Sequence, residues 1–163
     1  LWGRKNGVWY RAARFYYDAR KERRQKTDGE YAQDLDRLAG GRPIRGVVVD
    51  PSAASFSELL RRQGWSVIRA DNEVLSGIRR TAELLRAGAL VICSPCRDAI
   101  REFGLYRWDS SGTGGDRVIK AHDHAMDDIR YFAATVAAKK TRGFFAGNVE
   151  RSAQESPWEG RNL

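Results

Sequence analysis

The sequence has 163 residues, of which 42% are hydrophobic and 10% aromatic. That length suits one domain with a hydrophobic core, and the composition excludes a disordered chain. The net charge of +8, from 29 Lys and Arg against 21 Asp and Glu, favours a polyanionic partner such as nucleic acid. A membrane partner is the weaker alternative, because no lipidation signal, basic amphipathic helix, signal peptide or membrane-length apolar run is recognisable.

A β-hairpin is predicted at the start of the chain. Asn6-Gly7 supplies the two positive φ angles of a type I′ turn between residues 1–3 and a strand at residues 8–17. The charged segment that follows, residues 18–26, is either a solvated connection or a phosphate-contacting loop. Basic side chains suited to steering nucleic acid lie in this segment and on a later helix: Arg20, Lys21, Arg23, Arg24, Arg79 and Arg80.

Short apolar strands and capped helices alternate through the middle of the chain. Thr27 and Glu30 have the spacing of a capping box, which predicts a helix that ends at Gly40-Gly41. Hydrophobic periodicity predicts strands at residues 44–49, 65–70 and 89–92, and helices at residues 52–62, 74–86 and 95–103. This alternation, entered through a hairpin, indicates an α/β domain with a mixed β-sheet flanked by helices.

Cys93 and Cys96 are the only cysteines, in a C-x-x-C spacing. A redox role would require a helix start in a thioredoxin-like setting, and a structural zinc site would require two further ligands. We therefore favour a packing role. Two cysteines form no disulfide framework, which indicates a reducing compartment.

Residues 110–115 form a Gly-rich loop or hairpin tip that lacks the Gly-Lys-Ser/Thr ending of a P-loop, and no Walker motif occurs anywhere in the sequence. A last helix is predicted over residues 121–138. We expect residues 1–138 to form the domain and residues 139–163 to form a loosely attached polar tail.

The last helix carries the densest set of chemically active side chains. His124 lies three residues before Asp127 and four before Asp128, and Asp123 lies four before Asp127, so these groups share one helix face. A divalent cation offsets repulsion between such carboxylates, and hard oxygen ligands favour Mg²⁺ or Mn²⁺. Asp50 ends a buried strand, where open α/β sheets place catalytic groups.

Each of these acids also has a simpler interpretation. Asp123 is placed to cap its helix, and Asp128 to remain solvated or to pair with Arg130. Asp50, followed by Pro51-Ser52, is placed to start the next helix. The residues alone leave the metal site and these interpretations open.

Several motifs, in this order, resemble the nuclease domain of the large terminase subunit of tailed bacteriophages. The resemblance spans about residues 1–138 and is specific because the motifs occur together. It is carried by residues 16–18, 26–28, 30–31, 47–56, 72–79, 123–127 and 130–131.

The resemblance implies an RNase H-like fold and a metal-dependent endodeoxyribonuclease that cuts concatemeric viral DNA during packaging in the host cytoplasm. It assigns catalytic and metal-binding roles to Asp50, Asp127 and His124, with Asp128, Asp123 and Lys120 as supporting residues. Two Mg²⁺ or Mn²⁺ ions about 4 Å apart would activate water and stabilise the leaving oxygen. The implied partners are double-stranded viral DNA, an ATPase domain, the small terminase subunit and the portal.

The sequence departs from the family pattern in one respect. The family's first catalytic aspartate lies on a strand that precedes Leu1, so we expect an N-terminally truncated nuclease domain with weak or no cleavage. Two alternatives remain: another RNase H-like nuclease of the resolvase or transposase type, and a non-catalytic DNA-binding module supported by the basic charge.

Overall fold

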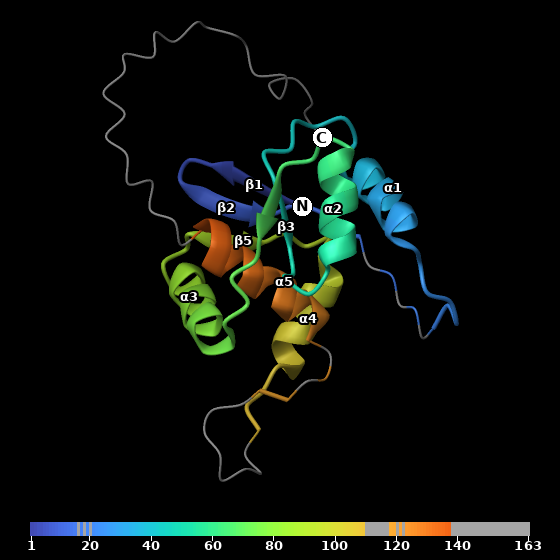
Figure 1. Cartoon of the computed structure of the whole chain (residues 1–163). Helices are drawn as coiled ribbons and strands as arrows, with labels where there is room; N and C mark the ends of the chain where they lie inside the picture. The colour runs from blue at the N-terminus through green and yellow to red at the C-terminus, as the bar shows by residue number, and fades with distance from the viewer. Residues whose placement is uncertain are drawn as a thin grey trace, which may run out of the picture.

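The computed structural model describes residues 1–15, 17, 19, 21–109, 118–119, 121 and 123–137. Its helices and strands follow the predicted alternation (Figure 1). In chain order they are β1 (Trp2–Lys5), β2 (Val8–Arg11), α1 (Asp28–Ala39), β3 (Val47–Val49), α2 (Ala54–Arg62), β4 (Val67–Arg69), α3 (Val74–Arg86), β5 (Leu90–Ile92), α4 (Arg97–Leu105), α5 (His124–Phe132) and a π-helical segment η1 (Ala133–Ala137).

The strands of the described residues form two sheets. The first has the order β1-β2-β5, with β1 antiparallel and β5 parallel to β2, and the second pairs β3 with β4 in parallel. A mixed sheet flanked by helices was predicted, and it is confirmed. The two parallel pairs are connected through helices, as parallel strands require.

The predicted hairpin is present, but its second strand is shorter than expected. Asn6 and Gly7 have φ angles of 51° and 84°, as a type I′ turn requires. The strand predicted over residues 8–17 ends at Arg11, which lies opposite Trp2. Beyond β2, the Ala12 amide donates to the Leu1 carbonyl at 3.0 Å and the Leu1 amino group donates to the Ala13 carbonyl at 2.7 Å.

The capping box of α1 is also confirmed. The Thr27 hydroxyl accepts from the Glu30 amide, and the Glu30 carboxylate accepts from the Thr27 amide at 2.8 Å. Gly40 ends the helix with φ 55°, a left-handed conformation that glycine adopts at little steric cost. These contacts are local, which is why the sequence predicts both ends of α1 closely.

The predicted last helix, residues 121–138, starts later and changes type. α5 begins at His124, and from Ala133 to Ala137 the backbone is π-helical. In the loop before it, Trp108 and Val118 form an antiparallel bridge, as a hairpin predicts. The Gly-rich tip at residues 110–117 and the predicted tail at residues 139–163 lie outside the described residues.

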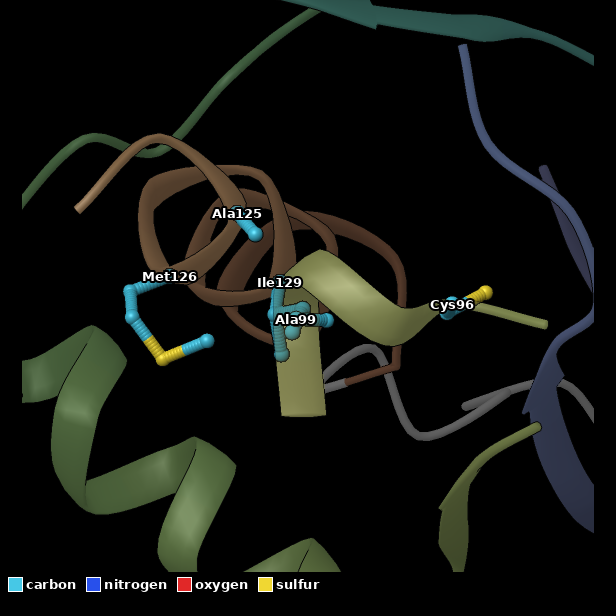
Figure 2. Close-up of a cluster of buried hydrophobic side chains, with 5 residues drawn as sticks. All are labelled: Cys96, Ala99, Ala125, Met126 and Ile129. Atoms are coloured by element: carbon cyan, nitrogen blue, oxygen red, sulfur yellow. The ribbon is translucent and has the colours of Figure 1, made fainter. Parts of the chain in front are cut away.

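Helix α5 lies between α3 and α4 in the core (Figure 1). Cys96, just before α4, and Ala99 on α4 pack against three residues of α5: Ala125, Met126 and Ile129. Figure 2 shows Met126 extending toward α3. The Cys96 thiol is fully buried and donates to the Arg11 carbonyl at 3.3 Å. Both cysteines are free thiols, and this packing matches the interpretation favoured for them.

A separate core lies under the β3-β4 sheet. Ala32 from α1, Val49 from β3 and the fully buried Leu60 from α2 form it. This packing fixes the end of β3, and so the position of Asp50, against α1 and α2. Within the described residues, no helix has the length and apolar character that crossing a membrane requires.

Acidification is expected to remove the contribution of Glu30 to α1. The Thr27 amide and the Arg24 guanidinium lower the pKa of Glu30 from 4.5 to about 2. Because the folded pKa is depressed, the stabilisation is present above about pH 4.5 and is lost as the pH falls through about 2. Urea unfolding of the wild type and Glu30→Gln from neutral pH down to about pH 2 checks this: the difference between them should be largest at neutral pH and vanish in acid.

Candidate functional site

The α5–η1 segment runs along the carboxyl edge of the β3-β4 sheet. The Tyr131 hydroxyl donates to Asp50 Oδ2 at 2.5 Å, immediately after β3. One helical turn later, Thr135 Oγ accepts from the Asp71 amide at 2.8 Å, two residues after β4. Because both strands end at this edge, the helix crosses the place where open α/β sheets bind ligands.

Asp50 is held by groups from two elements. Its Oδ1 accepts from the Ser52 amide at 2.8 Å and from the Ser52 hydroxyl at 2.6 Å, while Oδ2 accepts from Tyr131. The Ser52 hydroxyl first, and then Tyr131 and the Ser52 amide, lower the pKa of Asp50 by hydrogen bonding to its charged form. Asp50 therefore stays ionised and oriented at neutral pH.

Tyr131 is hydrogen-bonded to Asp50 and lies four residues after Asp127 on α5. Burial raises its pKa to about 12, with further contributions from its bond to Asp50 and from the negative charges of Asp127 and Asp50. The phenol therefore remains protonated and acts as a donor. Because Asp127 lies four residues before Tyr131 on α5, the two side chains share one helix face, and the bond of Tyr131 to Asp50 turns that face toward the end of β3.

Asp127 is paired with an arginine from its own helix. Arg130 Nη2 donates to Asp127 Oδ1 at 2.8 Å, three residues along α5. The sequence interpretation that paired Arg130 with Asp128 is wrong, because residues two apart on a helix do not face each other. Asp128 instead binds Arg11 of β2, with 2.5 Å between Asp128 Oδ2 and Arg11 Nη2.

The remaining predicted residues have varied positions. His124 is exposed at the first position of α5, three residues before Asp127. Asp123 occupies the N-cap position, but its side chain makes no cap hydrogen bond, so the capping interpretation is wrong. The amide of Ala125 is bound instead by Glu102 of α4, whose Oε2 accepts at 2.7 Å. Lys120 lies outside the described residues.

The chemistry of Asp50 and Asp127 fits part of a site for a hard divalent cation. Asp50 follows β3 and Asp127 lies on the helix that binds Asp50, and carboxylate oxygens suit Mg²⁺ or Mn²⁺. Among the residues that the structure describes, no three His, Cys, Asp or Glu side chains are grouped closely enough to hold a metal ion. The described part of the chain therefore offers two candidate carboxylate ligands rather than a complete metal-binding group.

The basic residues predicted to meet DNA fall into two groups. Four of them are exposed, Lys21, Arg23, Arg24 and Arg79, whereas Arg80 is half-buried. Arg24 is engaged by Glu30, and Arg80 binds Glu83 at 3.1 Å and the Ala137 carbonyl at 3.4 Å. Arg20 lies outside the described residues. The exposed residues are better placed than Arg80 for contact with a polyanion.

Sequence reasoning gave Tyr131 no role and Arg130 only a possible pairing with Asp128, and it missed Glu102 and Arg11. The Asp127–Arg130 spacing of three residues is a visible signal for that pair. The partners of Tyr131, Glu102 and Arg11 lie 81, 23 and 117 residues away along the chain. No local pattern predicts such contacts.

The α/β fold of this chain is similar to that of part of a phage large terminase. The chain is 43% identical to the large terminase from a thermophilic bacteriophage, with a TM-score of 0.82 for its complex with ADP. That match covers 84% of this chain and 35% of the phage protein. The complex of the same terminase with ATP-gamma-S gives 43% identity and a TM-score of 0.81, over 83% of this chain and 36% of the other.

These matches confirm the predicted resemblance to the large terminase subunit. The chain spans about a third of the length of that protein. No protein-family model and no curated protein sequence matches the chain.

Proposed function

We propose that this chain carries part of the metal-dependent endonuclease site of a DNA-packaging terminase. The observation that supports this most is the hydrogen bond from Tyr131 of α5 to Asp50 at the carboxyl edge of β3-β4, four residues after Asp127 on the same helix. The 163 residues contain no P-loop, so the nuclease is favoured over the nucleotide-binding part of a terminase.

Each candidate residue has a defined part in this proposal. Asp50 and Asp127 would each offer a carboxylate oxygen to Mg²⁺ or Mn²⁺, and His124 would add a ligand from the start of α5. Bound metal ions would supply an activated water and neutralise charge on the phosphodiester. Ser52 and Tyr131 keep Asp50 ionised and oriented, and Arg130 orients Asp127.

The proposed substrate is double-stranded viral DNA, in the host cytoplasm during phage assembly. Lys21, Arg23 and Arg79 would contact phosphates, which carry no sequence information, so we expect little base specificity. An ATPase domain, the small terminase subunit and the portal are the proposed partners.

Calorimetric titration with Mn²⁺ tests the site. We expect Asp50→Asn and Asp127→Asn each to weaken Mn²⁺ binding about tenfold or more, because each removes a charged oxygen ligand. The matched control Asp36→Asn changes an acid on α1, away from the site, and should bind Mn²⁺ like the wild type. Wild-type affinity in both site variants would exclude the site, and Mn²⁺-dependent nicking of supercoiled plasmid, lost in both, would establish the activity.

A non-catalytic DNA-binding module is the second candidate. It is favoured by the net charge of +8 together with the absence of a three-residue metal-binding group among the described residues. This function predicts salt-sensitive DNA binding that Asp50→Asn and Asp127→Asn leave intact or strengthen, with no cleavage by any variant. The plasmid assay distinguishes this binding module from another RNase H-like nuclease, because only the nuclease would cut the plasmid.

A further inference from the structure

Gly77 lies buried in the first turns of α3, directly beneath the side chain of Arg130 from α5. A Cβ atom at Gly77 would lie 2.3 Å from Arg130 Cγ and 2.9 Å from Arg130 Cδ. Real Cβ atoms do not approach other atoms so closely, so any other residue here would force Arg130 to move. Glycine weakens a helix interior, and its presence at this position gives the arginine stem room to cross α3.

The Arg130 guanidinium beyond this crossing is held from two sides. Its Nη1 donates to the Asn72 carbonyl at 2.8 Å, and its Nη2 donates to Asp127 Oδ1 at 2.8 Å. Only 6% of the side chain is exposed. A buried guanidinium needs a compensating charge, and Asp127 provides it. Arg130 and Asp127 therefore constrain each other, and the Asn72 carbonyl holds the other side of the Arg130 guanidinium.

These contacts connect two motifs that the sequence alone leaves separate, residues 72–79 and the Asp127–Arg130 pair. We propose that Asn72 and Gly77 form a cradle that fixes Arg130, and that Arg130 in turn positions the Asp127 carboxylate. Gly77 and Arg130 are then positioning residues for a candidate metal ligand, although neither offers a ligand atom. The consequence for metal binding rests on the proposed function, whereas the Gly77–Arg130–Asp127 coupling does not.

A double-mutant cycle tests the proposal by Mn²⁺ calorimetry. Gly77→Ala and Arg130→Ala should each weaken Mn²⁺ binding about 10- to 100-fold, the usual effect of losing a group that orients a metal ligand. The double variant should bind Mn²⁺ like Arg130→Ala alone, because alanine at position 130 has no Cγ or Cδ for the new methyl group to meet. If the losses of Mn²⁺ affinity in Gly77→Ala and Arg130→Ala multiply in the double variant, the proposed cradle is wrong.

A second readout needs no metal. The two hydrogen bonds of Arg130 hinder rotation of its guanidinium, so its Nη signals in ¹⁵N NMR spectra should be separate in the wild type. They should merge or shift strongly in Gly77→Ala and in Asp127→Asn. Unchanged Arg130 signals in Gly77→Ala would overturn the proposal whatever the metal does.

Thr27→Ala is the control for general destabilisation, since it removes the side-chain cap at the start of α1 and leaves the core under β3-β4 unchanged. It should lower stability and keep the wild-type Mn²⁺ affinity and Arg130 signals, in samples shown by circular dichroism to be folded. If Asp127→Asn leaves Mn²⁺ affinity unchanged while Gly77→Ala still releases Arg130, the proposed metal site fails and the positioning contact stands. If Asp127→Asn abolishes binding and Gly77→Ala does not, the positioning inference fails alone.

Discussion

Replacing Glu102 by alanine is expected to lower the free energy of unfolding by about 3 kcal/mol, from the combined loss of a helix cap and of a buried hydrogen bond. Glu102 is 1% exposed, and its Oε2 accepts from the Ala125 amide in the first turn of α5 at 2.7 Å. Without the carboxylate, this buried amide has no acceptor. The negative charge also interacts favourably with the N-terminal end of the helix dipole.

Glu102→Gln separates the two contributions. The amide oxygen still accepts a hydrogen bond, so only the charge–dipole interaction is lost, and we expect a decrease of about 1 kcal/mol. Urea denaturation of both variants gives the comparison. A Glu102→Ala variant within about 0.5 kcal/mol of the wild type would show that the cap does not stabilise α5.

Asp128→Ala is expected to lower the free energy of unfolding by about 2 kcal/mol, because it leaves the Arg11 guanidinium buried without its carboxylate. The Arg11 side chain is only 5% exposed, whereas Asp128 is 49% exposed, so water relieves part of the loss. Among the described residues, Arg11 Nε and Nη1 already lack hydrogen-bond partners, which makes the remaining bond to Asp128 more important.

The double variant Arg11→Met, Asp128→Ala is the matched control. It removes the buried charge along with its partner, and replacing such a pair by an apolar side chain is often nearly neutral, so stability should largely recover. Mn²⁺ affinity should stay at the wild-type value in both variants, since Asp128 faces β2. Weaker Mn²⁺ binding by Asp128→Ala would show that Asp128 contributes to the metal site.

The elements most accurately predicted are those whose determinants are neighbours in the sequence. The Asn6-Gly7 turn and the Thr27–Glu30 capping box depend on contacts within a few residues, and both are present. The strands are shorter than the apolar runs that predict them. Pairing ends where the neighbouring strand ends, as at Val47–Val49 opposite Val67–Arg69, and the sequence of one strand does not contain that information.

The first turn of α5 shows the same limit. Asp123 has the residue type and the position of an N-cap, yet the cap bond to Ala125 comes from Glu102 on another helix. A non-local acceptor of this kind depends on how α4 packs against α5. Residue preferences at helix ends indicate which nearby side chains can cap a helix. They do not indicate whether a carboxylate from another helix will take that place.

The sequence by itself determined that Asp50 ends a buried strand and that Asp127 lies on a helix with His124, because hydrophobic runs and helical spacing are local properties. Only the tertiary structure decided that Tyr131 joins Asp50 to that helix, that Arg130 engages Asp127, and that Arg11 engages Asp128. The physical reason is that a buried charge takes the partner that packing brings within reach, and packing is a property of the whole fold.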